Sequence, residues 1–216
     1  MAIINDIDGN VYNTTKIGTQ EWTTNNFKGT KFFDGTPIPL LTANADWSAT
    51  TTPTYCYLNN DPSYNDTHGK LYNGHTASAS KELIPLWSIP SSADFNTLTQ
   101  YLIDNGYNHD GTSAGNKIAK SLSSKSSLWT TSITSGNPGN DISSNNKSCW
   151  SAYPSGWRAL DGTFYNFNDR TYFWNNTQSD PNNAFSNYLL FNAPDLKSQT
   201  SNIICGFSIR LCRTIQ

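Results

Sequence analysis

Charged residues are scarce in this sequence. Only 14% of its 216 residues are charged, and the formal net charge at pH 7 is −2. Lysine and arginine are spread thinly along the chain, so no basic face is expected that would hold the phosphates of a nucleic acid or of an anionic membrane. We therefore expect no nucleic acid partner and no binding to an anionic membrane surface.

Long hydrophobic runs and a recognisable leader are also missing. No stretch of about 18 apolar residues occurs, so no segment is expected to insert into a membrane. The first residues lack the charged and apolar regions of a signal peptide. Either a leader preceded them or export does not use one, as for a virion protein. We expect an extracellular, cell-surface or phage-virion location.

Cysteine is the third scarce residue, with four in the chain: Cys56, Cys149, Cys205 and Cys212. An even number allows two disulfides, in any of three connectivities that spacing does not separate. A core of this size does not require such cross-links, so four free thiols are equally compatible with the sequence.

Neutral polar and aromatic residues make up for this scarcity. The chain contains 27 asparagines, and 13% of its residues are aromatic. So many aromatic side chains can bury a large apolar area, which excludes disorder. The combination is typical of an extracellular β-rich protein in which Gly and Asn supply the turns. No linker or change of composition divides the chain, so one domain is predicted over residues 1–216.

Two helices are predicted near the middle of the chain. Ser91 or Ser92 can cap the first helix, and Gly106 can close it. Its apolar residues fall on one helical face: Phe95, Leu98 and Leu102. A shorter helix is predicted around residues 115–122, and a long loop rich in Ser, Asn and Gly over residues 131–147.

Strand and turn patterns occupy both ends of the sequence. Turns are predicted at three Asp-Gly pairs: Asp8-Gly9, Asp34-Gly35 and Asp161-Gly162. The closing segment, residues 206–212, alternates with a period of two and is predicted to be a strand. Phe207, Ile209 and Leu211 would share one face, and Ser208, Arg210 and Cys212 the other.

Several motifs occur in a characteristic order. They are Asp8-Gly9-Asn10-Val11-Tyr12, the run 16–22, the run 34–40, Tyr55-Cys56-Tyr57, Trp157-Arg158 and the run 206–210. Together they resemble the Fibrobacter succinogenes major paralogous domain over nearly the whole chain. The chain departs from the family at residues 83–87, Leu-Ile-Pro-Leu-Trp, where the family usually has Cys-Pro-x-Gly-Trp.

The resemblance implies a fold. The family is placed with the C-type lectin-like folds, a superfamily that also contains the formylglycine-generating enzymes. We therefore expect an α+β domain with a C-type lectin-like fold. It would have antiparallel strands, about two helices, long loops, and paired N- and C-terminal strands.

Catalytic signatures are weak. No nucleophile elbow, phosphate-binding loop or zinc-type cysteine pair occurs, and three histidines are interpreted as surface residues: His68, His75 and His109. The alternative is copper oxidase chemistry like that of the formylglycine-generating enzymes, for which Cys205 and Cys212 are the candidates. Seven residues apart on one strand, they would point to opposite faces. We predict a protein that is not an enzyme and needs no cofactor.

Calcium is the second metal considered. Trp174-Asn175-Asn176 and Asp180-Pro181-Asn182 resemble fragments of the calcium site of sugar-binding C-type lectins, but they occur in reverse order and the first lacks a carboxylate. Calcium requires several oxygen ligands, some of them charged. No metal site is predicted, and Asp8 and its neighbours are interpreted as a hairpin turn.

The final third of the chain is the predicted binding region. Nine asparagines lie between residues 166 and 202, interleaved with aromatic residues. Aromatic rings fill pockets or stack on sugars, and amides donate and accept hydrogen bonds without charge. The predicted ligand contacts are Tyr165, Asn168, Tyr172, Trp174, Asn175, Asn176, Asn182, Asn183, Asn187, Tyr188, Phe191, Asn192 and Asn202. The competing interpretation is that the aromatics form core and the asparagines form turns, and it is preferred for Phe173, Leu189 and Leu190.

These observations predict a recognition module displayed on a bacterial surface or a phage tail. It would bind a host or cell-surface glycan or protein through residues 165–203. Resemblance adds that a diversity-generating retroelement would make asparagine codons in this region hypervariable. A homo-oligomer, a trimer in a phage fibre, is compatible with this function. A formylglycine-generating-type oxidase and a purely structural surface scaffold are the alternatives.

Overall fold

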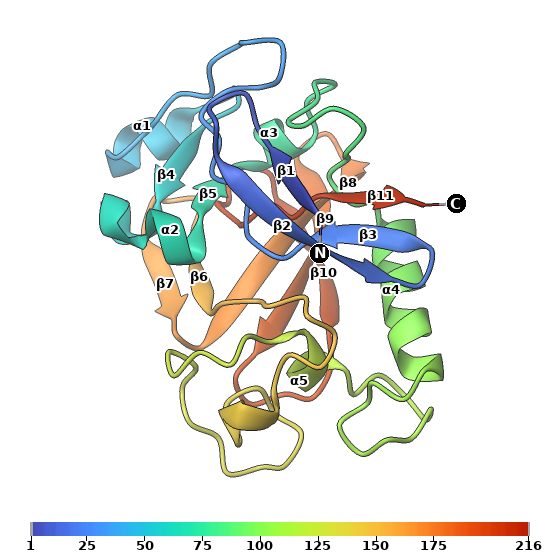
Figure 1. Cartoon of the computed structure of the whole chain (residues 1–216). Helices are drawn as coiled ribbons and strands as arrows, with labels where there is room; N and C mark the ends of the chain where they lie inside the picture. Colours follow the sequence, from blue (N-terminus) through green and yellow to red (C-terminus); the bar gives the residue numbers. More distant parts are fainter. Residues whose placement is uncertain (1, 216) are drawn as a thin grey trace.

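The computed structural model describes residues 2–215 and begins with the predicted hairpin (Figure 1). Gly9 adopts a positive φ of 83°, and its N–H donates to the Asp6 carbonyl oxygen at 3.1 Å. The hairpin belongs to a four-stranded sheet of order β1-β2-β3-β11, whose strands are β1 (Ile3–Asn5), β2 (Val11–Ile17), β3 (Gln20–Thr23) and β11 (Cys212–Thr214). Cys212 lies opposite Trp22, so the predicted pairing of N- and C-terminal strands is confirmed.

A five-stranded sheet of order β10-β9-β8-β6-β7 carries most of the C-terminal third. Its strands are β6 (Ser155–Arg158), β7 (Phe164–Phe167), β8 (Arg170–Asp180), β9 (Asn183–Leu190) and β10 (Lys197–Asn202). A third sheet pairs β4 (Tyr55–Tyr57) with β5 (Lys70–Tyr72). Within residues 2–215 only β6 and β8 pair in parallel among these strands, which confirms a mixed α+β fold with mostly antiparallel sheets.

The longest helix, α4 (Ser92–Asp104), forms as its sequence predicts and lies along one side of the molecule (Figure 1). The Ser91 hydroxyl accepts from the Asp94 N–H, and the Asp94 carboxylate accepts from the Ser91 N–H, which completes a capping box. Its predicted apolar face is buried. The second predicted helix is shorter than expected, because only α5 (Ala119–Leu122) is helical.

The prediction of about two helices is wrong. Residues 2–215 contain five α-helices, and the additional ones are α1 (Asn44–Ala49), α2 (Asn65–His68) and α3 (Gly74–Ala77). With four to six residues each, they are too short to show a helical period. Short 3₁₀ turns lie at Leu58–Asn60, Pro62–Tyr64 and Ile142–Ser144, the last of them inside the otherwise irregular loop 131–147. None of the helices described is long and apolar enough to cross a membrane.

The closing segment keeps its predicted alternation but is not one continuous strand. Residues 206–208 make isolated bridges, and strand geometry resumes at Cys212. One face joins the cluster around Tyr12, Tyr72, Trp174 and Phe207. Cys212 joins a second cluster, which includes Trp22, Phe95, Trp150 and Phe173. Because neighbouring residues of β8 join different clusters, the five-stranded sheet lies between the two halves of the core.

Two buried arginines tie loops to these sheets. Arg158 is 0% exposed and donates to the carbonyl oxygens of Leu41, Thr42 and Gly162 at 2.7 to 2.8 Å. Arg210 is 1% exposed and has four acceptors of its own. Both belong to the motifs that carry the family resemblance, and both act as structural donors.

Candidate functional site

A row of aromatic side chains crosses the five-stranded sheet. Tyr165 on β7 lies opposite Trp157 on β6, with ring centroids 5.6 Å apart. Tyr172 on β8 lies opposite Tyr188 on β9 at 5.0 Å, and 5.8 Å from Trp157. Four neighbouring strands thus each place one ring in register. These four residues are called the aromatic row below, and Lys197 of β10, opposite Tyr188, extends it.

The rings of the aromatic row differ in what they present to solvent. Tyr165 is 45% exposed, Trp157 and Tyr188 are half-buried, and Tyr172 is 5% exposed. The planes of Tyr172 and Tyr188 are stacked at 25°, and Phe207 stacks beneath Tyr172 at 16°. Stacked rings cover one another's faces, so the middle of the row offers ring edges and hydroxyls. The end at Tyr165 offers an exposed ring.

A hollow of about 230 Å³ lies beside the aromatic row. Trp157, Tyr172 and Phe207 form its apolar part together with Leu160, which is 53% exposed. Strand β10 supplies the polar groups: Gln199, Thr200, Ser201 and Asn202. Apolar walls with a few polar groups at the edge are the usual composition of a ligand site.

Part of the predicted ligand set lies at this site. Tyr165, Tyr172 and Tyr188 belong to the aromatic row, and Asn202 lines the hollow. Trp157 and Leu160 were missed. Trp157 is part of the Trp-Arg motif and was interpreted only as a family marker, and the single exposed leucine gives no sequence signal.

Three predicted contacts lie in the core instead, which corrects their assignment. Trp174 is 0% exposed, and its indole N–H donates to the Tyr72 carbonyl oxygen at 2.7 Å. Asn175 is 1% and Asn187 7% exposed. The Asn175 amide donates to the Ser92 hydroxyl at 3.1 Å and so ties β8 to the start of α4. None of the three offers surface to a ligand.

Five other predicted residues lie at opposite ends of the sheet. Asn182 in the β8–β9 turn and Asn183 at the start of β9 donate to the Asp180 carboxylate at 2.8 to 3.0 Å. Asn168, in the left-handed conformation with φ 71°, lies at the other end, as do Phe191 and Asn192 after β9. The predicted set therefore does not form one surface.

The family described as Fibrobacter succinogenes major domain matches residues 15–213 of the sequence. The chain belongs to this family. The match includes the strands that carry the aromatic row and both buried arginines. Comparison with curated proteins and with solved structures gives no match.

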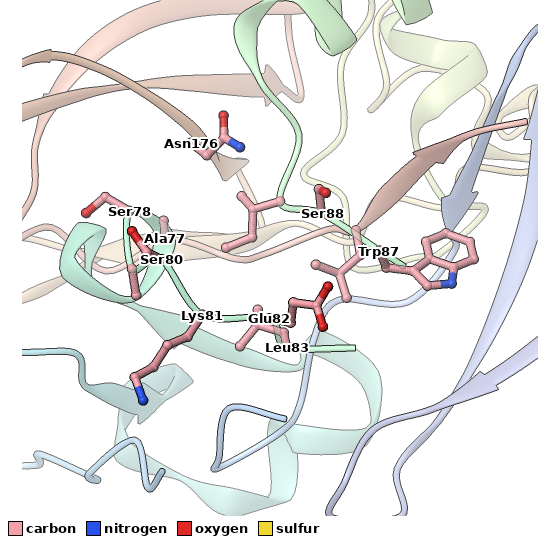
Figure 2. A pocket seen from close by; sticks show the side chains of 12 residues that line it. Ala77, Ser78, Ser80, Lys81, Glu82, Leu83, Trp87, Ser88 and Asn176 are labelled. Atoms are coloured by element: carbon pink, nitrogen blue, oxygen red, sulfur yellow. The ribbon is translucent and has the colours of Figure 1, made fainter. Parts of the chain in front are cut away.

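A second hollow of this Fibrobacter succinogenes major domain has a volume of about 450 Å³ (Figure 2). It is lined by residues 77–83, residues 87–89, Leu211 and Asn176 of β8. Asn176 is the one predicted ligand residue here. The other lining residues come from segments distant in sequence, and only the departure from the family motif at residues 83–87 marked the region.

The cysteines of this family member do not favour a two-thiolate copper site. All four are free, and Cys205 and Cys212 pack in different core clusters. Burial raises the pKa of the Cys205 thiol to about 11 and that of Cys56 to about 12. Burial also raises the pKa of Cys212, so the thiolates that bind metals are disfavoured. Within residues 2–215, no group of three or more His, Cys, Asp or Glu side chains could hold a metal ion.

The interpretation of His68 as a surface residue is wrong. Its side chain is 1% exposed and packs against the rings of Tyr64, Tyr153 and Phe167. Its Nδ1 lies 3.2 Å from the Ser155 hydroxyl. Burial lowers the pKa of His68 to about 4, so the imidazole is neutral at pH 7 and contributes to the core.

Proposed function

We propose that this protein is a non-catalytic recognition module that binds a glycan or protein of a cell surface through the aromatic row and the adjacent hollow. The observation that carries the proposal is the register of four aromatic rings on neighbouring strands beside an apolar hollow of about 230 Å³. Rings fixed on a sheet lose little conformational entropy when a ligand binds, so their contacts contribute efficiently to affinity.

The proposed contact set is narrower than the sequence-based one. It comprises Tyr165, Trp157, Tyr188, Leu160, Gln199 and Asn202, which line the row or the hollow and are exposed or half-buried. Two cations lie beside this surface. Arg170 donates from Nη1 to the Tyr172 hydroxyl at 3.2 Å, and Lys197 forms an ion pair with Asp195 at 2.8 Å. A mostly neutral and amphipathic surface suits a glycan or an uncharged protein patch.

We further propose a C-type lectin-like scaffold displayed on a bacterial surface or a phage tail, with exposed asparagines diversified by a retroelement. Asn176, Asn182 and Asn192 are exposed and could change without disturbing the core. Display in several copies, as a homo-oligomer, would multiply a weak contact by avidity.

A binding screen with matched variants tests the proposal. The purified protein would be applied to a glycan array and to intact bacterial cells, and each ligand found would be titrated against Trp157→Ala and Tyr165→Ala. Loss of a central aromatic contact costs more than about 1 kcal/mol, so we expect an affinity loss of about tenfold.

The control is Tyr101→Ala, which removes a tyrosine that is 36% exposed on α4. It should leave binding unchanged. Equal losses for Tyr101→Ala and Trp157→Ala would contradict the assignment of the site. If no ligand binds in either screen, a purely structural scaffold becomes the better account.

A further inference from the structure

The hollow in Figure 2 combines an apolar floor with polar walls. Its floor is apolar and consists of buried side chains: Ala77, Leu83, Trp87, Ile89 and Leu211. Its walls are polar. Figure 2 shows the Glu82 carboxylate and the Asn176 amide on different sides of the space, with the Ser88 hydroxyl nearby.

The polar groups of the walls are free to bind a ligand. Within residues 2–215, the side chains of Ser80, Glu82, Ser88 and Asn176 make no hydrogen bond to the protein, and Glu82 makes no ion pair. Lys81 does not neutralise Glu82. It points away from the hollow, forms an ion pair with Asp34 and donates to the Thr36 hydroxyl at 2.7 Å.

The backbone around the hollow is nevertheless fixed. Ser88 exchanges two hydrogen bonds of 2.9 Å with Cys212, and the Glu82 carbonyl oxygen accepts from the Phe33 N–H at 2.8 Å. The Asn176 N–H donates to the Pro90 carbonyl oxygen at 2.9 Å. The backbone therefore fixes where Glu82, Ser88 and Asn176 lie, while their exposed side chains become ordered only when a ligand binds.

We propose that this hollow is a second binding site, which takes a single hexose unit of a glycan. A carboxylate accepts from two neighbouring hydroxyls, while an amide and serine hydroxyls both donate and accept, which matches the alternating groups of a sugar. The small apolar part of the lining can contact C–H groups of a pyranose ring. The free negative charge of Glu82 disfavours anions such as phosphate and sulfate. The volume of about 450 Å³ lies within the range of small-molecule sites, about 300–1,000 Å³.

This site is separate from the proposed recognition surface. The two hollows share no lining residue, and on β8 the fully buried Trp174 lies between Tyr172 of the aromatic row and Asn176. Binding of a hexose here does not depend on the function proposed for the aromatic row, and either site can fail alone.

An NMR titration of the ¹⁵N-labelled full chain tests the proposal. D-Glucose, D-galactose, D-mannose and N-acetyl-D-glucosamine would be added singly, with the open-chain polyol sorbitol and ethylammonium chloride as comparison probes. We expect at least one hexose to give saturable shifts of the amides at 77–83, 87–89 and 176. The dissociation constant should be on the order of millimolar, which is what about a dozen heavy atoms support. Sorbitol and ethylammonium should give none.

Variants separate this site from the aromatic row. Glu82→Gln and Asn176→Ala should each weaken hexose binding about tenfold. Glutamine replaces one acceptor oxygen of the carboxylate by a donor, and alanine removes the amide of Asn176. Asp104→Asn, a change of an exposed carboxylate on α4, and Tyr165→Ala should leave it unchanged. The proposal is overturned if no hexose gives saturable shifts, if the shifts centre on the aromatic row, if sorbitol or ethylammonium shifts the same amides, or if Glu82→Gln binds like the wild type.

Discussion

Arg210→Met is expected to destabilise this protein more than the loss of an exposed arginine. The guanidinium is 1% exposed and donates to Asn26 Oδ1 and to the carbonyl oxygens of Thr23, Trp150 and Ser151, at 2.6 to 2.9 Å. It therefore connects the end of β3 with the segment that precedes β6. Methionine fills much of the same volume but leaves all four acceptors without a donor.

The size of the effect follows from those acceptors. A buried polar group without a partner costs about 1–3 kcal/mol, so four such acceptors would lower the free energy of unfolding by about 4 kcal/mol or more before any compensation. Removing the buried cation offsets part of this, because its own desolvation is no longer required. We expect a net loss of about 3–5 kcal/mol, a large share of the roughly 5–15 kcal/mol that stabilises a domain. Arg210→Lys should lose about 2 kcal/mol, since an ammonium cannot reproduce the planar fork of donors.

Urea denaturation followed by tryptophan fluorescence measures this loss. The matched control is Arg170→Met, which removes a half-buried arginine with one hydrogen bond, to the Tyr172 hydroxyl. It should cost less than about 1 kcal/mol. If Arg210→Met unfolds within about 1 kcal/mol of the wild type, with an unchanged slope, the four acceptors find other partners and the reasoning from buried polar groups is refuted.

Three further predictions use the same protein. Ser91→Ala should lower the free energy of unfolding by about 1 kcal/mol in urea denaturation, because it removes the capping box of α4. Burial lowers the pKa of His68 from 6.5 to about 4, so between these values the histidine is protonated in the unfolded state but not in the folded one. The free energy of unfolding should therefore fall by about 2–3 kcal/mol between pH 7 and pH 4.5. This part of the pH dependence should vanish in His68→Gln. A thiol reagent should modify only the exposed Cys149 in the native protein, and the other three cysteines only after unfolding: Cys56, Cys205 and Cys212.

Local signals in the sequence were sufficient for part of the fold. The capping residues and apolar face of α4 lie within one short window, so its position could be predicted from neighbouring residues alone. The alternation of residues 206–212 likewise identified which side chains point into each half of the core. The helices α1 to α3 were missed because one turn of helix carries no period that distinguishes it from a loop.

The candidate site depends on contacts that no local window contains. Tyr172 and Trp174 alternate onto the same face of β8, yet Trp174 is completely covered while Tyr172 lies at the margin of a hollow. Alternation indicates the face of a strand, but which end of that face is covered depends on the segments around Tyr72 and Phe207, far away in sequence. Composition alone therefore included buried residues, such as Trp174 and Asn175, in the predicted binding region.

This division between buried and exposed asparagines makes the proposed diversification testable. A process that mutates adenines treats the codons of Asn175 and Asn187 like those of Asn176, Asn182 and Asn192. Selection for a folded protein distinguishes these positions, because Asn175 and Asn187 are buried and hydrogen-bonded to each other at 3.4 Å. Deep sequencing of the gene from its source population should show changes at the three exposed positions and few at the two buried ones. Equal frequencies at all five would contradict the structural role of the buried pair, whereas an absence of changes at all five would leave a recognition surface of fixed specificity.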